Sequence, residues 1–245
     1  MKVDQEVLSV LSLLEINGNQ VKITSQLERK LYERTNKVLE AAGGKWNTKA
    51  KAHIFPGDAE EALDQVINTG VIAIHQEMGS FFTPEIIVDL LIELAHIQPG
   101  MLVLEPSAGI GNIVKKLLSA TDNVSCIEID QKHCDQLRKN CGNVNLLCTD
   151  FLTFPAVPLF DRVVMNPPFA KQADIDHVIH ALKFVKPGGR LVSVMSAGIY
   201  FRENKKTIGF RELMTEHGGI LQRLPEGAFK ESGTMVNTVI VEIPN

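Results

Sequence analysis

The segment Met101-Leu-Val-Leu-Glu-Pro-Ser-Ala-Gly-Ile-Gly111 decides how this chain folds. Its first four residues are apolar and predict a short buried strand, and the two glycines near its end predict a tight turn. The apolar residues of 113–118 then recur at helical spacing around two lysines. A strand, a glycine turn and a helix in this order are typical of the first half of a βαβ unit.

The same alternation of strand and helix continues towards the C-terminus. The further expected strands are Val124–Ile127, Val144–Cys148, Arg162–Met165 and Arg190–Met195, with helical patterns between them. Strands separated by helices predict right-handed crossovers and a parallel sheet with helices on both faces. The last two strand-like runs, Ile220–Leu224 and Val236–Ile243, are close enough to pair antiparallel. We therefore expect an α/β three-layer sandwich whose mostly parallel sheet carries a C-terminal antiparallel hairpin.

The first 75 residues have a different pattern. Helical spacing ends at Gly43-Gly44, residues 46–55 alternate as in a β-arm, and Asp58 is placed to cap a further helix. We expect two domains, a small basic N-terminal α+β segment over residues 1–75 and the sandwich over residues 76–245. No flexible Gly/Ser linker marks the boundary between them.

The composition is that of an ordinary soluble globule. Of 245 residues, 44% are hydrophobic and 22% are charged, which excludes the disordered, collagen-like and coiled-coil classes. No apolar run is long enough to span a membrane, and the acids among the first six residues argue against an export signal, so we expect a cytoplasmic protein. Four cysteines without a CxxC motif predict buried free thiols rather than a disulfide or a zinc site. They are Cys126, Cys134, Cys141 and Cys148.

The net charge of −4 argues against a nucleic-acid partner, but the charge is unevenly distributed. The segment Val21–His53 holds eight basic and three acidic residues, so it is positive while the rest of the chain is strongly negative. A local basic patch is the electrostatic footprint of a polyanion contact. The expected contacts are Trp46, Lys49 and Lys51 on the β-arm and Arg34 and Lys37 on the preceding helix. The alternative is a helix face that is merely solvated.

The ends of the expected strands carry the candidate ligand contacts, because ligands of such sheets bind outside the carboxyl ends of the strands. Gly109 and Gly111 allow a ligand to approach the backbone, and Glu128 ends the next strand at the spacing where an acid holds ribose hydroxyls. Glu105 opens the turn, where an acid disfavours a pyrophosphate and suits a ligand that carries an amino group and a positive centre. S-adenosylmethionine has this charge pattern. Asp150-Phe151 follows the third strand, where the carboxylate can accept from an adenine amine.

The turn Asn166-Pro167-Pro168-Phe169 follows the fourth expected strand and is the sharpest signal in the sequence. Two prolines remove two backbone donors and stiffen the turn. The Asn166 side-chain oxygen and the backbone carbonyls then remain as fixed acceptors beside an aromatic ring. Such acceptors suit an exocyclic or amide NH2 group, which they hold with its lone pair towards a methyl group, so that transfer depends on positioning.

In this order the motifs resemble the amino-group DNA methyltransferases. The match is closest to the gamma-class N6-adenine enzymes, which include the modification subunits of type I restriction systems. The motifs are GSFFTP (79–84), LEPSAGIG (104–111), CIEID (126–130), DF (150–151) and NPPF (166–169). The resemblance covers residues 79 to 245. It implies a Rossmann-like methyltransferase fold and direct transfer from S-adenosylmethionine to the exocyclic amine of a flipped adenine in DNA.

The resemblance also assigns roles to individual residues. The cofactor residues would be Phe82, Thr83, Pro84, Glu105, Pro106, Ser107, Gly109, Gly111, Glu128, Ile129, Asp150, Phe151 and Asn166. Ile129 and Phe151 would sandwich the cofactor adenine. Catalysis would fall to Asn166, Pro167, Pro168 and Phe169, with Phe169 stacking on the target base and Phe229 forming the other side of the base slot.

Other interpretations stay open at this point. RNA adenine and protein-glutamine methyltransferases also use a proline turn with an aromatic residue, and a non-catalytic binding subunit could have the same fold. Gamma-class enzymes usually continue into a recognition domain, so either the basic segment replaces that domain, a separate recognition subunit supplies it, or the enzyme has little sequence specificity. His177 and His180 share a helix face, but without a third ligand we expect no metal site.

Overall fold

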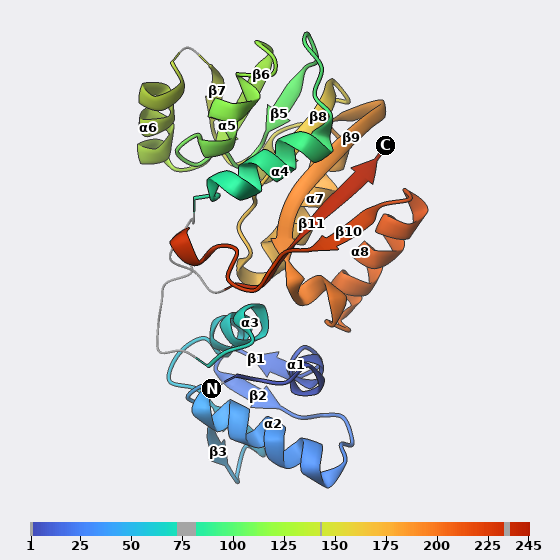
Figure 1. The fold of residues 1–245 in the computed structure, drawn as a ribbon. Helices are drawn as coiled ribbons and strands as arrows, with labels where there is room; N and C mark the ends of the chain where they lie inside the picture. Colours follow the sequence, from blue (N-terminus) through green and yellow to red (C-terminus); the bar gives the residue numbers. More distant parts are fainter. Residues whose placement is uncertain (1, 73–81, 143, 233–235) are drawn as a thin grey trace. The chain divides into compact units, whose positions relative to one another are not determined.

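A computed structural model describes residues 2–72, 82–142, 144–232 and 236–245 of the chain (Figure 1). The chain divides into two compact units. The larger comprises Gly79–Ser196 and Phe210–Asn245, and the smaller comprises Met1–Met78 and Ala197–Gly209.

The larger unit is built on a seven-stranded sheet with the order β10-β11-β9-β8-β5-β6-β7. Its strands are β5 (Val103–Glu105), β6 (Val124–Glu128), β7 (Asn145–Cys148), β8 (Phe160–Met165), β9 (Val185–Ser196), β10 (Ile220–Arg223) and β11 (Thr238–Pro244). The pairs from β7 across to β9 are parallel, while β11 pairs antiparallel with both β9 and β10. The expected mostly parallel sheet with a C-terminal antiparallel hairpin is confirmed.

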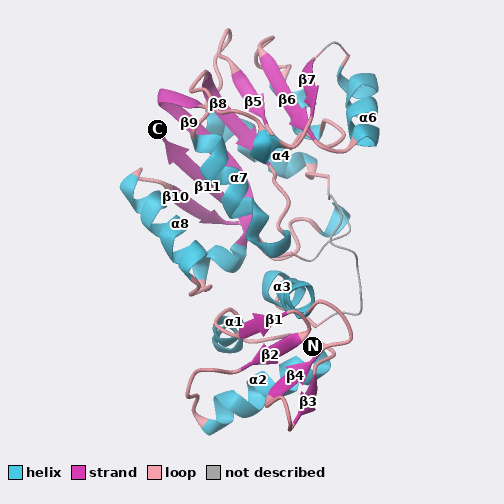
Figure 2. Cartoon of the chain, turned by 180° about the vertical axis from the view of Figure 1, so that it is seen from behind, coloured by secondary structure: helices cyan, strands magenta, loops and turns pink. Residues whose placement is uncertain are grey.

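Helices cover both faces of this sheet. They are α4 (Glu85–Ala95), α5 (Asn112–Leu117), α6 (Gln131–Cys141), α7 (Ala173–Leu182) and α8 (Lys205–Glu216). In Figure 1 α4 lies in front of the sheet, and Figure 2, drawn from behind, has α7 in front, so these two helices lie on opposite faces. The core beneath α4 and α5 contains Leu91, Ile113, Leu117, Val164 and Val192. The three-layer sandwich is therefore confirmed.

The smaller unit has a four-stranded antiparallel sheet with the order β1-β2-β4-β3. Its elements are α1 (Gln5–Leu11), β1 (Glu15–Asn17), β2 (Gln20–Lys22), α2 (Arg29–Ala41), β3 (Lys45–Asn47), β4 (Ala52–Ile54) and α3 (Ala59–Thr69). The helices pack on one face of the sheet, where Leu11, Val21, Leu39, Phe55 and Leu63 form a common core. The local elements agree with an α+β segment.

The segment Ala197–Gly209 belongs to the smaller unit, although it lies between β9 and the rest of α8 in the sequence. Arg202 is buried there and donates hydrogen bonds to Asp64 and Asn68 of α3. A buried guanidinium needs a carboxylate partner, so this ion pair fixes the segment to α3. The division expected at residues 75 and 76 therefore has to be corrected, because it assigned the segment to the other domain.

The cysteines also differ from expectation, because Cys134 and Cys148 form a disulfide. Cys134 lies on α6 and Cys148 ends β7, and their Cα atoms are 6.2 Å apart, a separation that a disulfide can span. Periodicity does not reveal that these two elements pack together. Cys126 and Cys141 are free thiols, as expected.

Two structural features are absent from the described residues. Within these ranges, no helix combines the length and apolar character needed to cross a membrane. The same part of the chain contains no group of three or more His, Cys, Asp or Glu side chains arranged to hold a metal ion.

Candidate active site

A pocket of about 190 Å³ opens at the carboxyl ends of β5 and β8 in the larger unit. It is lined by Phe82, Thr83, Glu105, Ser107, Ala108, Gly109, Ile110, Asn112, Ile113, His133 and Asn166. The structure thus brings together six of the residues that the sequence predicted, from three separate motifs. The position at the carboxyl edge of a parallel sheet is the expected one.

The glycine turn after β5 is held by Glu128 at the end of β6. One carboxylate oxygen of Glu128 accepts from the Gly109 N–H at 2.7 Å, and the other accepts from the Asp130 N–H at 2.9 Å. Gly109 and Gly111 both have positive φ, and a Cβ at Gly111 would lie 2.7 Å from the Cys141 sulfur. Glycine is therefore required at position 111 by both its conformation and its packing.

Glu105 is the most unusual group in the pocket. It is only 1% exposed, and among the described residues no donor reaches its Oε2 atom. Burial, and then the charge of Glu128, raise the pKa of Glu105 well above its usual value, while the Val114 N–H acts in the opposite direction. A buried carboxyl group without a donor is costly unless a ligand compensates it. The pocket is therefore suited to a ligand that brings a positive charge to Glu105.

Asn166 offers the pocket an acceptor. Its Nδ2 donates to the Thr83 hydroxyl at 3.0 Å, and the Thr83 carbonyl accepts from Asn112 Nδ2 at 3.2 Å. The Oδ1 atom of Asn166 is buried, and no donor in the described parts of the chain reaches it. Since the amide donor is engaged by Thr83, the oxygen is the part of the amide left for a ligand.

The proline turn continues from Asn166 along the rim. Pro167 is buried, Pro168 is exposed, and Phe169 is half-buried, with part of its ring packed against the core. Lys171 and Gln172, which follow Ala170, both have positive φ, a conformation that costs free energy in residues other than glycine. The turn is therefore held in shape by the surrounding structure.

The structure contradicts two of the expected aromatic contacts. Phe229 is 1% exposed and lies in the hydrophobic core, so its ring is not available to a base. Phe151 is 3% exposed, and its ring packs on His180 and Phe184 at centroid distances of 4.8 and 5.2 Å. Both rings are large and apolar, and burial in the core outweighs exposure to a ligand.

The remaining cofactor candidates lie around the pocket and do not line it. Ile129 is 68% exposed, and the Asp150 carboxylate accepts from the Leu152 N–H, which caps a short 3₁₀ turn. Pro84 is the N-cap of α4, and Pro106 is buried in the turn after β5. Their predicted roles towards the cofactor stay predictions.

Sequence reasoning missed several lining residues, among them His133 and Asn112. Asp130 caps α6 by accepting from the N–H groups of Lys132 and His133, which puts His133 in the first turn, 3.7 Å from Glu128. Asn112 is the first residue after the glycine turn. The sequence did contain a signal for His133. Asp130 is an acid placed before a helical pattern, and such an N-cap puts the first turn of the helix, with His133, next to the end of the preceding strand.

Of the expected nucleic-acid contacts on the smaller unit, Arg34 has to be corrected. Its guanidinium forms ion pairs with Asp4 at 3.0 Å and with Glu6, and the hydrogen bond to Glu6 contributes most to raising its pKa. The charge is therefore compensated within the chain. Lys37 is exposed on α2, whereas Trp46, Lys49 and Lys51 lie on the β3–β4 hairpin.

The chain is similar in sequence to enzymes that modify ribosomal RNA. The family model for ribosomal RNA adenine dimethylase matches residues 74–184. The probable ribosomal RNA small subunit methyltransferase A of Methanosarcina barkeri is 26% identical over 168 residues, which cover 64% of this chain and 56% of the relative. The corresponding enzyme of Francisella tularensis subsp. novicida is 35% identical over 78 residues, 31% of this chain and 30% of the relative. The chain thus spans little more than half the length of the first of these relatives.

Solved structures agree on the fold. A dimethyladenosine transferase from Plasmodium falciparum superposes with a TM-score of 0.52 at 20% identity and covers 68% of this chain and 64% of that one. The methyltransferase subunit of a type I restriction-modification system from Streptococcus thermophilus gives 0.58 at 18% identity, over 76% of this chain and 49% of that one. At these identities the likeness establishes the Rossmann-like methyltransferase fold and nothing more.

These matches confirm one prediction and overturn another. S-adenosylmethionine, the predicted cofactor, is confirmed. The predicted membership of the gamma-class DNA N6-adenine methyltransferases is wrong, because both the family model and the curated relatives are ribosomal RNA enzymes. DNA as the acceptor and a role in restriction and modification are wrong for the same reason. The prediction of a separate recognition subunit depended on that resemblance and loses its basis.

Proposed function

We propose that this chain is an S-adenosylmethionine-dependent adenine N6-methyltransferase that acts on RNA, with ribosomal RNA as the substrate class. The observation that carries the proposal is the match of residues 74–184 to ribosomal RNA adenine dimethylase. The matched segment contains the glycine turn, Glu128 and the Asn166 turn. RNA adenine methylation was the alternative that the proline turn left open.

On the cofactor side, the pocket supplies a buried negative group and a close backbone approach. When bound, S-adenosylmethionine supplies an electrophilic methyl group on a positively charged sulfur. Glu105 is the group that would compensate this positive charge or the ammonium of the same molecule, because its Oε2 is buried and lacks a donor among the described residues. Gly109 lets the ligand approach the turn, and Glu128 keeps the turn in place through the Gly109 N–H.

On the acceptor side, Asn166 holds the nitrogen that receives the methyl group. Its Oδ1 and the Pro167 carbonyl would accept hydrogen bonds from the adenine amine and tilt it so that its lone pair points out of the base plane. Phe169, half-buried at the rim, would support the base. An adenine in this position has left its stack, so flipped or single-stranded RNA is the suitable substrate.

An engaged, correctly oriented amide favours an enzyme over a binding subunit. The Asn166–Thr83 hydrogen bond engages the amide nitrogen and leaves Oδ1 as an acceptor for a ligand. This orientation is the one that methyl transfer to an amine requires. Positioning of this kind lowers the barrier for transfer by fixing the reacting atoms before the reaction.

The test is transfer of labelled methyl groups from S-adenosylmethionine to small-subunit ribosomal RNA, to DNA of matched sequence and to protein. Label on N6 of adenine in RNA is expected. Asn166→Ala should lower the rate roughly a hundredfold or more while cofactor binding persists, because it removes the acceptor. Asn36→Ala, at a half-buried position on α2 in the smaller unit, is the matched control and should be fully active. Label on DNA or protein alone would refute the proposed acceptor.

A further inference from the structure

The small sheet has one face covered by helices and one face open to solvent. Residues that lie opposite one another in an antiparallel pair point to the same side. Val21, His53 and Trp46 form one such row, and Val21 and His53 are fully buried on the helix side. The neighbouring positions point to the other side. That side exposes Glu15, Asn17, Gln20, Lys22, Lys45 and Asn47, with Ile54 half-buried among them.

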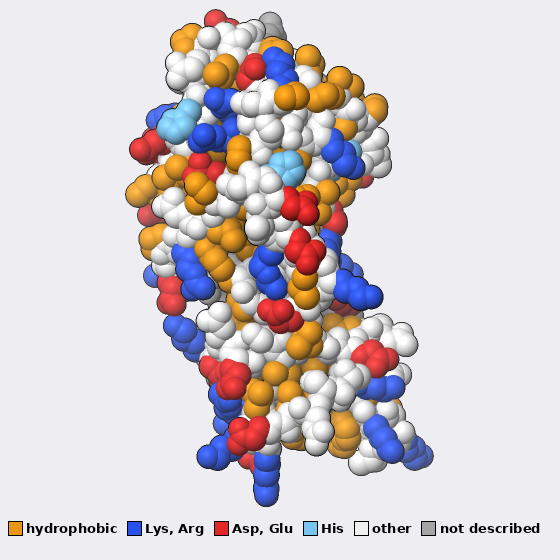
Figure 3. All heavy atoms as spheres, turned by 90° about the vertical axis from the view of Figure 1, so that its right-hand side faces the viewer, with side chains coloured by type: hydrophobic (Ala, Val, Ile, Leu, Met, Phe, Trp, Pro, Cys, Tyr) orange, Lys and Arg blue, Asp and Glu red, His pale blue; other side chains and the backbone are white. Residues whose placement is uncertain are grey.

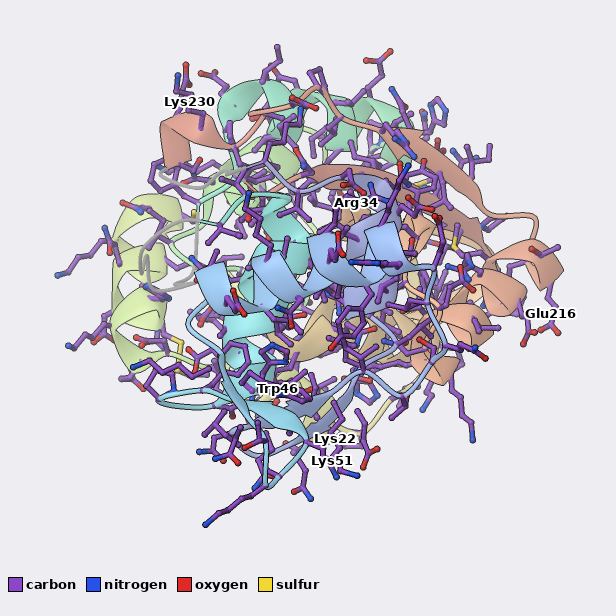
Figure 4. All side chains as sticks on the ribbon, turned by 90° about the horizontal axis from the view of Figure 1, so that it is seen from below. Lys22, Arg34, Trp46, Lys51, Glu216 and Lys230 are labelled. Carbon is purple, nitrogen blue, oxygen red and sulfur yellow. A yellow bond between two sulfur atoms is a disulfide. The ribbon has the colours of Figure 1, made fainter. Side chains whose placement is uncertain are left out.

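Two further lysines extend this open side. The β3–β4 turn carries exposed Lys49 and Lys51. The side-chain Oδ1 of Asn47 fixes the turn by accepting from the backbone N–H groups of Lys49 and Ala50, both at 3.0 Å. Lys22, Lys45, Lys49 and Lys51 together form the basic sheet face. In the view of Figure 4, Lys22, Trp46 and Lys51 come from the strands and the hairpin of the small sheet, and Arg34 comes from α2.

The charge of the basic sheet face is uncompensated. None of its four lysines forms an ion pair with a carboxylate in the described ranges, and Glu15, opposite Lys22, is the acid on the strands of this side. On α2, by contrast, Arg29 pairs with Glu33, and Arg34 pairs with Asp4 and Glu6. In Figure 3 long blue side chains project into solvent from the small unit, seen in the lower part of the view.

Trp46 adds an aromatic ring at the edge of this sheet. It lies on the edge strand β3, is 48% exposed, and contacts the His53 ring edge-on at a centroid distance of 5.2 Å. His53 is buried beneath it, which supports Trp46 from one side and leaves the rest of the indole in solvent. By its row the indole lies on the helix side of the edge strand, while Lys45 of the same strand lies on the other side, so one strand of RNA reaches both around this edge. An exposed indole at such an edge is typical of a platform on which a base stacks.

We propose that the basic sheet face and Trp46 bind a single-stranded segment of the RNA substrate, away from the nucleotide that is methylated. The lysines contact phosphates and Trp46 stacks on an unpaired base. Lysines alone would suit any polyanion, but an aromatic platform and the amides of Gln20 and Asn47 beside them suit a nucleic acid better than an acidic protein or a lipid surface. The choice of RNA rests on the proposed function.

The sequence offers a direct reporter, because Trp46 is the only tryptophan in the chain. Titration of the full chain with a short single-stranded RNA should quench the Trp46 emission in a saturable manner. Raising the salt concentration should weaken binding, with a slope of about 0.7 per phosphate contact. RNA that binds without changing the Trp46 emission would refute the stacking contact.

Charge variants test the lysines. Replacing all four lysines of the basic sheet face with Gln should weaken RNA binding roughly tenfold or more and lower the salt slope. The matched control replaces two exposed lysines of the larger unit with Gln, Lys139 of α6 and Lys183 after α7, neither of which is an expected nucleic-acid contact; binding and slope should not change. Equal effects of the two variants would overturn the proposal, as would an unchanged affinity in the fourfold variant. All six side chains are exposed, so circular dichroism should find both variants folded.

The test also separates this proposal from the proposed function. If the chain methylates RNA while the fourfold variant binds RNA normally, the proposed RNA-binding surface is refuted and the proposed function is supported. If RNA quenches the Trp46 emission but only DNA or protein is methylated, the proposed function is refuted and the proposed RNA-binding surface is supported. Quenching by anionic lipid vesicles or polyglutamate but not by RNA would assign the surface to another partner and refute the RNA proposal.

Discussion

The side-chain amide of Asn166 donates to the hydroxyl of Thr83 at 3.0 Å. Thr83 directly precedes the Pro84 cap of α4, and Asn166 directly follows β8, so the bond joins two segments 83 residues apart. It leaves Asn166 Oδ1 turned towards the pocket with no donor among the described residues. The orientation of the acceptor is therefore set by Thr83 as well as by the proline turn.

Thr83→Val should lower the rate of methyl transfer roughly tenfold while the affinity for S-adenosylmethionine changes little. Valine keeps the shape of the side chain but removes the hydroxyl, so the Asn166 amide loses the bond that fixes its orientation. The measurement is single-turnover kinetics beside calorimetric cofactor binding. Thr83→Ser keeps the hydroxyl and should restore most of the rate. If Thr83→Val is as active as the wild type, the Thr83 hydroxyl has no role in methyl transfer.

Glu105→Gln should weaken cofactor binding roughly tenfold or more and abolish the pH dependence of that binding. Burial raises the pKa of Glu105 well above its usual value, so a cationic ligand must displace a proton from Glu105 over the pH range in which the free protein holds it. Binding should therefore tighten as the pH rises and should release a proton. Calorimetry in buffers of different ionisation enthalpy measures that proton. Equal proton release by wild type and variant would assign the proton to another group.

The same shift predicts how the stability of the free protein depends on pH. A raised pKa means that the folded state holds the proton more tightly, so this contribution is present below the ordinary pKa near 4.5 and is lost as the pH rises through the folded value. Wild type should lose stability over this range, and Glu105→Gln should not. Thermal denaturation of both proteins at several pH values decides this, and parallel curves would contradict it.

Loss of the disulfide between Cys134 and Cys148 should destabilise the larger unit by about 3 kcal/mol, the value for closing a loop of roughly 15 residues. Denaturation with and without reductant measures the effect. The variant with Cys134→Ala and Cys148→Ser should be insensitive to reductant. Cys141→Ser, which removes a free thiol, serves as the control and should keep the sensitivity of the wild type. If reductant does not change the denaturation of the wild type, the disulfide adds no stability.

Acid should destabilise the smaller unit through His53. Burial lowers the pKa of this group, against the charge of Glu40, so its contribution to stability is present above the ordinary value of 6.5 and is lost as the pH falls from there through the folded value. Trp46, in contact with His53, reports unfolding by fluorescence. His53→Leu should keep its urea midpoint at acid pH, since neither ring nitrogen has a partner among the described residues. If the urea midpoint falls equally at acid pH in the wild type and in His53→Leu, His53 is not the cause of the loss of stability.

The sequence was sufficient for the sheet and for the centre of the pocket. Periodicity of apolar residues fixes strands such as β6 and β8, and the carboxyl ends of parallel strands must meet at one edge. That rule alone brings Glu105 and Asn166 into one pocket, although 61 residues separate them. Thr83 lies in the same pocket as Glu105 and Asn166, because the residues before α4 run along the carboxyl edge of the sheet.

Contacts between distant elements could not be predicted in this way. A motif position does not reveal whether an aromatic ring points inward, and Phe151 and Phe229 both pack into the protein. The ion pairs of Arg34 and the disulfide of Cys134 depend on which elements become neighbours. Short motifs also describe the reaction better than its substrate. The Asn166 turn suits an amine in DNA, RNA or protein, and only the similarity of a longer segment favoured RNA.

The ion pair between Arg202 and Asp64 sets an order on folding during synthesis. The small unit takes its first part from residues 1–78 and its last from residues 197–209. Helix α3 leaves the ribosome long before Arg202, so its Asp64 and Asn68 can receive the guanidinium only after strands β5 to β9 have been made. Domains usually fold in the order in which they emerge. Here the first domain to emerge is the one that can be completed only after most of the second has been translated.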